Sequence, residues 1–157
     1  MTRRVLFVCL GNICRSPLAE AAFRQAAAEI GLAAEADSAG TGGWHRGEPP
    51  DRRAIATAQR NGVDISQLRA RQVQPSDFAH FDHVIALDRD NLADLRALQP
   101  ARGLARLSLL LDHVPGREGE AVADPYYGGD ADFDITWRDV SEAARALAAS
   151  LAREEAA

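Results

Sequence analysis

The 157-residue chain carries 18 basic and 23 acidic residues, which gives a formal net charge of −5 and no electrostatic support for nucleic-acid binding. Hydrophobic residues make up 46% of the chain and charged residues 26%, which is typical of a globular protein. The apolar runs fall far short of the ~20 residues that a membrane span needs. We therefore expect a single domain over residues 1–157 with one core.

Residues that bind metals or form disulfides are few. Both cysteines, Cys9 and Cys14, fall in one short segment, so we expect no disulfide framework and a reducing, cytoplasmic location. The four histidines are scattered, at His45, His80, His83 and His113. The sequence therefore predicts no metal site and no cofactor.

The N-terminal segment predicts a strand, a loop and a helix in quick succession. The apolar run Val5–Val8 is typical of a buried strand, and the loop that follows begins at Cys9. Ser16 suits the N-cap of a helix and Pro17 its first position. We expect this helix to run from Ser16 to Ile30 on an apolar stripe of Leu18, Ala22, Ala26 and Ile30, and to end at Gly31.

The rest of the chain alternates strands with helices. In chain order we expect a strand near Ala34–Ser38, a glycine-rich loop over Ala39–Pro50, a helix over Asp51–Asn61 with Asp51 as N-cap and Gly62 after it, a helical turn over Pro75–Ala79, a strand over His83–Leu87, a helix over Asp90–Leu98, and a fourth strand within Leu104–Leu111. After a loop over Val114–Gly129, a last helix over about Asp132–Arg153 is expected, with fraying from Glu154 onward. Strands separated by helices predict an α/β fold with a parallel sheet, which binds ligands beyond the carboxyl ends of its strands.

The loop after the first strand has the composition of an anion-binding site. Cys9 and Arg15 are separated by five residues, and the loop ends at a helix start, where backbone N–H groups converge. Arg15 offers a planar fork of donors that matches phosphate oxygens, and Gly11 allows unusual backbone angles. The same positive field favours the thiolate of Cys9, which predicts phosphoryl transfer through a phosphocysteine. The alternative is that Cys9 is only a small buried hydrophobic residue; the strand before the loop and the helix after it favour the catalytic interpretation.

Three motifs together carry a family resemblance: C-L-G-N-I-C-R-S-P at 9–17, D-S-A-G-T at 37–41 and D-P-Y-Y at 124–127. The chain resembles low-molecular-weight protein tyrosine phosphatases over essentially its whole length. The resemblance implies a three-layer, flavodoxin-like fold with a four-stranded parallel sheet and helices on both faces. It also implies metal-independent hydrolysis of protein phosphotyrosine and small aryl phosphates, with Cys9 as nucleophile, Arg15 as phosphate-binding residue and Asp124 as general acid and base.

The resemblance implies roles for further residues. The phosphate-binding loop would comprise Leu10, Gly11, Asn12, Ile13, Cys14 and Arg15, supported by Asn12, Ser16 and Ser38. Aromatic walls would come from Trp44, Tyr126 and Tyr127, which would select phosphotyrosine over the shorter phosphoserine. Cys14 would protect Cys9 through a reversible disulfide, and Gln67 stands where the family usually has a histidine.

Simpler interpretations of the same residues stay open. Ser16 can be only a helix cap, and Asp124 can be part of a turn before Pro125. Tyr127 can be an anchor of its loop, and Cys14 can be a packed loop residue.

Partners and rival functions also follow from these motifs. A tyrosine-phosphorylated protein is the expected substrate, a bacterial tyrosine kinase is a candidate partner, and phosphate or other oxyanions are expected inhibitors. An arsenate reductase of the class that shares this loop needs further cysteines for its relay, and the chain has only two, so arsenate reduction stays open only through mixed disulfides with external thiols. A non-catalytic phosphate binder needs neither a nucleophile nor an acid. Neither common nucleotide-binding glycine motif occurs.

Overall fold

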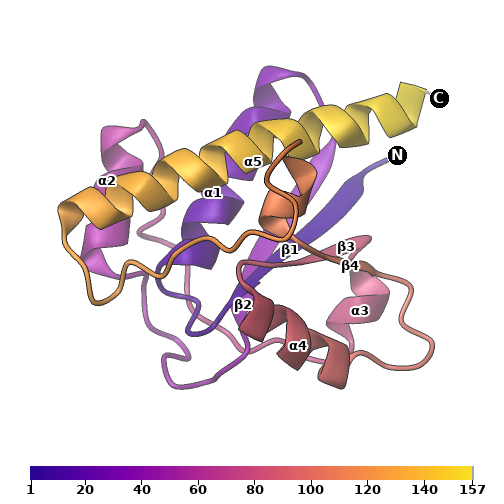
Figure 1. The fold of residues 1–157 in the computed structure, drawn as a ribbon, viewed down its shortest axis with the longest axis horizontal. Coiled ribbons are helices and arrows are strands. Elements are labelled where there is room, and N and C mark those ends of the chain that lie inside the picture. The colour runs from indigo at the N-terminus through magenta and orange to yellow at the C-terminus, as the bar shows by residue number, and fades with distance from the viewer. Residues whose placement is uncertain (157) are drawn as a thin grey trace.

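The computed structural model describes residues 1–156 and has a central sheet covered by helices on both faces (Figure 1). Its four parallel strands, β1 (Arg3–Cys9), β2 (Ala34–Gly40), β3 (His83–Ala86) and β4 (Arg106–Leu109), lie in the order β2-β1-β3-β4. The helices are α1 (Arg15–Glu29), α2 (Arg52–Arg60), α3 (Asp77–His80), α4 (Arg89–Leu98), the 3-10 helix η1 (Leu110–His113) and α5 (Asp130–Ala156). The predicted three-layer α/β domain with a four-stranded parallel sheet is confirmed.

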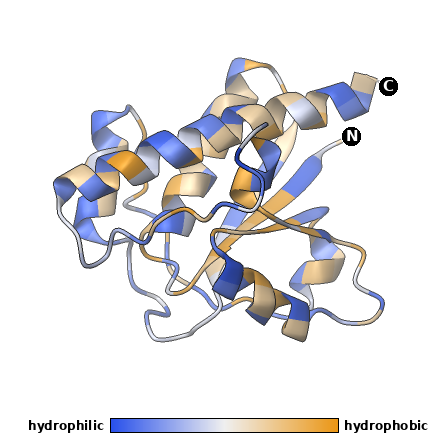
Figure 2. Ribbon diagram, in the orientation of Figure 1, coloured by the Kyte–Doolittle hydropathy of each residue, from blue (hydrophilic) through white to orange (hydrophobic). Residues whose placement is uncertain are grey.

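The two faces of the sheet bury two separate apolar clusters, because successive side chains of a strand point to opposite sides. In β1, Val5 and Phe7 pack with α1, α2 and α5, whereas Leu6 and Val8 pack with α3 and α4. Figure 2 shows hydrophobic residues concentrated in the strands, while the outer helices are mixed. Burial of Val5–Cys9 on both faces of the sheet explains why this part of β1 is an uninterrupted apolar run rather than an alternating one.

The strand order places the loop after β1 at a distinctive position. The chain leaves β1 through α1 to β2 on one side, and later returns to place β3 on the other side of β1. The order of strands therefore reverses between β1 and β3, and the loops diverge there. This is the point at which open α/β sheets bind ligands, and residues 10–14 occupy it.

Most of the predicted helix ends are confirmed. Asp51 caps α2 by accepting a hydrogen bond from the backbone N–H of Arg53 at 2.8 Å. Gly31 and Gly62 follow α1 and α2 with φ values of 68° and 84°, the left-handed conformation expected there.

Two predictions at the ends of α1 are wrong. The helix begins at Arg15 with Cys14 in the N-cap position, and no side chain caps it. Ser16 lies one residue inside the helix because its hydroxyl is held within the preceding loop instead. Ile30 lies just beyond the last turn and is 51% exposed, so it is not part of the core.

The C-terminal helix is longer than predicted. Helix α5 continues through Ala156, and Glu154 in its last turn forms ion pairs with Arg3 at 3.2 Å and with Arg106 at 3.6 Å. These pairs fasten the last turns beside the N-terminal ends of β1 and β4. The fraying predicted for Ala157 lies outside the described residues. Within residues 1–156, no helix has the length and hydrophobicity that crossing a bilayer requires.

Candidate active site

The thiol of Cys9 lies at the carboxyl end of β1, almost fully buried. Its Sγ is 3.0 Å from the hydroxyl Oγ of Ser16, and the backbone N–H of Asn12 donates to it at 3.3 Å. Both groups converge on one sulfur at the N-terminal end of α1. With the Ser16 hydroxyl as donor, this arrangement suits a thiolate.

The loop keeps its shape through Asn12, which is buried and has a positive φ of 60°. Its amide nitrogen donates to the Ser16 hydroxyl at 2.8 Å, and its side-chain oxygen accepts from the backbone N–H of Arg71 at 3.0 Å. Asn12 therefore connects the loop both to α1 and to the segment that precedes α3. A left-handed non-glycine residue held from two sides turns its own backbone N–H toward the sulfur of Cys9.

Arg15 is buried beside the loop between two carboxylates. Its Nη1 donates to Asp88 at 2.7 Å and to the carbonyl of Val122 at 3.1 Å, and its Nη2 is 3.6 Å from a carboxylate oxygen of Asp124. Burial acts to lower the pKa of Arg15, but the negative charges of Cys9 and Asp88 outweigh it and raise the pKa. The guanidinium is therefore a permanent, oriented cation at the edge of the loop.

Asp124 is half-exposed at the rim of the site, and its two carboxylate oxygens have different partners. Oδ1 accepts from the backbone N–H of Tyr126 at 3.1 Å, which is the turn expected before Pro125. Oδ2 faces Arg15. The turn thus orients the carboxylate across the opening from Cys9, so the structural interpretation and the catalytic one are compatible.

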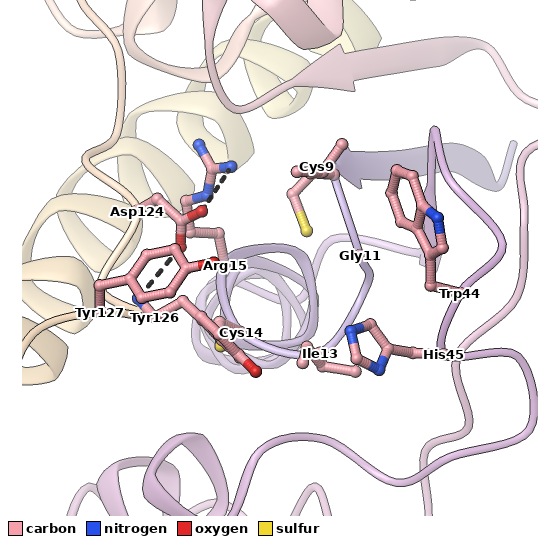
Figure 3. A pocket seen from close by; sticks show the side chains of 11 residues that line it. Cys9, Gly11, Ile13, Cys14, Arg15, Trp44, His45, Asp124, Tyr126 and Tyr127 are labelled. Atoms are coloured by element: carbon pink, nitrogen blue, oxygen red, sulfur yellow. Dashed lines mark hydrogen bonds and ion pairs between the residues drawn. The ribbon is translucent and has the colours of Figure 1, made fainter.

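These groups surround a pocket of about 200 Å³, called here the Cys9 pocket (Figure 3). Cys9 lies between Asp124, Tyr126 and Tyr127 on one side and Trp44 and His45 on the other. The remaining lining residues are Leu10, Gly11, Ile13, Cys14 and Arg15. A nucleophile at the base of an anion-binding loop, with an acid at the rim, suits displacement at phosphorus. Within residues 1–156, no cluster of histidine, cysteine or acidic side chains is arranged to hold a metal ion.

Residues 4–157 match the family described as "Low molecular weight phosphotyrosine protein phosphatase". The chain is 42% identical to a low molecular weight protein-tyrosine-phosphatase of Bacillus subtilis, covering 96% of this chain and 97% of that one. It is 40% identical to the human low molecular weight phosphotyrosine protein phosphatase, covering 93% and 94%. The chain belongs to this family. A crystal structure of a protein tyrosine phosphatase from Entamoeba histolytica superposes with a TM-score of 0.91, at 33% identity over 98% of this chain and 99% of that one.

In this member of the low molecular weight phosphatase family, one predicted supporting residue, Ser38, has another partner, and Gln67 does not contact the loop. The hydroxyl of Ser38 donates to the buried carboxylate of Glu20 at 2.8 Å rather than to the phosphate loop. Gln67 is exposed, and the segment that contains it reaches the loop through the backbone N–H of Arg71 instead. Ser38 therefore supports the loop only through the packing of β2 against α1.

Cys14 is a buried free thiol in the same loop. Burial raises its pKa above the ordinary value, and the nearby negative charge of Asp51 adds to the effect. Its thiol is therefore protonated and poorly nucleophilic near neutral pH.

Sequence reasoning missed three residues of the phosphatase site: Asp88, His45 and Arg53. Asp88 follows β3 and also caps α4, and an acidic residue directly after a buried strand was a usable signal. His45 packs against Gly11, where an added Cβ would lie 3.1 Å from its ring, and pairs with Glu48. Arg53 holds the loop that carries the two tyrosines, because it donates to the carbonyl of Tyr126 at 2.8 Å.

Proposed function

We propose that this protein hydrolyses phosphotyrosine in proteins, and small aryl phosphates, with Cys9 as the nucleophile, Arg15 as the phosphate-binding residue and Asp124 as the general acid and base. The convergence of the Ser16 hydroxyl and the Asn12 N–H on the sulfur of Cys9 is the observation that carries this proposal. A buried sulfur surrounded by donors is suited to be a thiolate, which is the reactive form of cysteine.

The first chemical step transfers the phosphoryl group to the enzyme. The Cys9 thiolate attacks phosphorus while the bond from phosphorus to the tyrosine oxygen breaks. Asp124 gives its proton to that oxygen, because a tyrosinate whose conjugate acid has a pKa of ~10 leaves poorly without one. Arg15 and the backbone N–H groups of residues 10–15 bind the phosphoryl oxygens and stabilise the added charge.

The second step returns the enzyme to its starting state. A water molecule attacks phosphorus on the side opposite Cys9, and Asp124 accepts its proton. The bond from sulfur to phosphorus breaks, which releases inorganic phosphate and regenerates the thiolate. One carboxylate therefore acts first as acid and then as base, and its partly exposed position at the rim lets it reach both the leaving oxygen and the water.

The aromatic residues at the mouth suit a phenyl ring. Trp44 is 72% exposed and Tyr127 is 95% exposed, and with Tyr126 they stand on opposite sides of the opening. An aryl ring stacked between these walls places its phosphate at the depth of Cys9, whereas the shorter phosphoserine does not reach it.

A tyrosine-phosphorylated protein in a reducing cytoplasm is the proposed substrate, and a bacterial tyrosine kinase is a candidate for it. Phosphate and other oxyanions should compete for the loop. The related structure from E. histolytica, which has Hepes in its active site, supports this, since Hepes carries a sulfonate.

Hydrolysis of p-nitrophenyl phosphate without added metal tests the proposal. We expect turnover by the wild type, none by Cys9→Ser, and a loss of roughly 10²–10⁴-fold in kcat for Asp124→Asn. Asp130→Asn, at the exposed start of α5, is the matched control and should keep full activity. An active Cys9→Ser variant, or equal losses in the two aspartate variants, would contradict the assignment.

A further inference from the structure

A second hollow of about 530 Å³ adjoins the Cys9 pocket and is called here the α4 groove. It is lined by Leu10, Thr41, Gly42, Gly43, Trp44, Gln72, Val73, Asp94 and Leu98. Leu10 and Trp44 line both hollows, so the side chains that wall the Cys9 pocket on this side also form one end of the groove. The two hollows therefore adjoin at Leu10 and Trp44.

The lining of the α4 groove changes character along its length. Near the Cys9 pocket it is apolar, with Leu10 45% exposed and Trp44 72% exposed. Leu98 and Asp94 extend it along α4. Exposed leucine and tryptophan side chains that adjoin one another are the kind of surface that binds a partner. Asp94 is the only charged side chain in this lining, and within residues 1–156 it takes part in no ion pair, while the guanidinium of Arg46, outside the lining, donates to the side chain of Gln72.

We propose that the α4 groove binds the substrate segment directly next to the phosphotyrosine, and that it favours an apolar neighbour followed by a lysine or arginine. This rests on the proposed function, because it takes the phosphotyrosine to be seated in the Cys9 pocket. An extended peptide advances ~3.3 Å per residue. With the phosphotyrosine in the Cys9 pocket, the residues next to it on one side therefore lie over Trp44 at the rim. Leu10, Trp44 and Leu98 then cover the apolar neighbour, and Asp94 attracts the cation that follows.

The hollow on the opposite side of the Cys9 pocket has a different charge pattern. Its lining holds two acidic residues, Glu48 and Asp51, and two arginines, Arg52 and Arg53, and Asp51 forms an ion pair with Arg53. The carboxylate of Asp94 is not neutralised in this way. Charge complementarity therefore assigns the basic part of the substrate to the α4 groove.

Phosphotyrosine peptides that differ in one flanking position test the proposal. One pair carries leucine or serine next to the phosphotyrosine, and a second pair carries lysine or glutamate two or three residues away. Each pair is made on both sides of the phosphotyrosine. For each enzyme variant, the kcat/KM measured with a peptide is divided by the kcat/KM measured with p-nitrophenyl phosphate. This small substrate is too short to enter the groove. An enzyme inactive on p-nitrophenyl phosphate would refute the proposed function instead, so the two failures are distinguishable.

The expected result is a charge preference that follows residue 94. Wild type should favour the lysine peptide over the glutamate peptide on one side, and Asp94→Asn should reduce that ratio about 2- to 5-fold, the range for a solvent-exposed ion pair. Asp94→Arg should reverse the preference, which a purely structural role for Asp94 would not do. The preference should also weaken as salt is added. Asp90→Asn, one turn earlier on α4 and outside the groove, is the matched control.

The apolar part of the groove is tested in the same way. Leu98→Ala should lower the ratio of kcat/KM between the peptides with leucine and with serine next to the phosphotyrosine. Leu104→Ala, at an exposed position outside the groove, should leave this ratio unchanged. The proposal would be overturned if Asp94→Arg left the ratio of kcat/KM between the lysine and glutamate peptides unchanged. It would also be overturned if Asp90→Asn shifted that ratio as much as Asp94→Asn does.

Discussion

The left-handed conformation of Asn12 can be separated experimentally from its hydrogen bonds. Asn12→Gly removes the bonds to Ser16 and Arg71 but keeps a residue that accepts a φ of 60°. Asn12→Ala removes the same bonds and also places a Cβ in the left-handed region. The difference between the two variants therefore measures the cost of this backbone conformation.

The magnitudes follow from the geometry. Two hydrogen bonds at 2.8 and 3.0 Å contribute ~0.5–1.5 kcal/mol each, so Asn12→Gly should lower the free energy of unfolding by about 1–3 kcal/mol. A left-handed alanine costs a further ~1–2 kcal/mol, and the greater freedom of unfolded glycine offsets ~0.4–1 kcal/mol of that difference. Asn12→Ala should thus be less stable than Asn12→Gly by about 1 kcal/mol.

Urea unfolding of both variants measures this difference, and Asn61 provides the matched control. Asn61 also donates from its side chain to a backbone carbonyl, but its φ is −105°, so there alanine should be the more stable replacement. If alanine and glycine were equally stable at position 12, or ranked as at position 61, the reasoning about the loop would be refuted.

Three further predictions concern single groups of the site and the core. Asp88→Asn keeps the cap oxygen of α4 but loses the charge that orients Arg15, so kcat/KM for aryl phosphate should fall about 10-fold; unchanged kcat/KM would contradict this. Because burial raises the pKa of Cys14, iodoacetamide at neutral pH should modify it only after unfolding, and mass spectrometry showing rapid modification of the folded protein would contradict this. Burial also raises the pKa of Glu20, outweighing its bonds to Ser38 and Arg24, so the folded state holds that proton more tightly than the unfolded state. The free energy of unfolding should therefore fall as pH rises from about 4.5 through the raised pKa, and a wild-type minus Glu20→Gln difference that is constant with pH would contradict this.

The phosphate loop could be predicted because its signals are local. The apolar run Val5–Val8, the spacing of Cys9 and Arg15, and the helix that follows all lie within one short segment, and together they allow few other arrangements. The parallel sheet followed from the alternation of strands and helices. Ser16 shows the limit of local signals, because the same serine before a proline suits a helix cap and a loop support equally well.

Long-range partners could not be predicted in the same way. Asp88 is 73 residues from Arg15, and nothing in either segment indicates that they form an ion pair. The segment that contains Gln67 has no regular secondary structure, so counting residues along it did not show which one reaches Asn12. Ser38 is adjacent to the loop in the fold, but the buried Glu20 competes for its hydroxyl. Choices between neighbouring partners depend on packing, which only the folded structure shows.

The most direct test of the central claim is to identify the covalent intermediate. A phosphotyrosine peptide should be mixed with the enzyme and quenched in acid within one turnover, and the protein then digested and analysed by mass spectrometry. The proposed mechanism predicts a phosphoryl group on the peptide that contains Cys9, absent from Cys9→Ser. Turnover with phosphate found on another residue, or with no phosphoenzyme at any quench time, would contradict it.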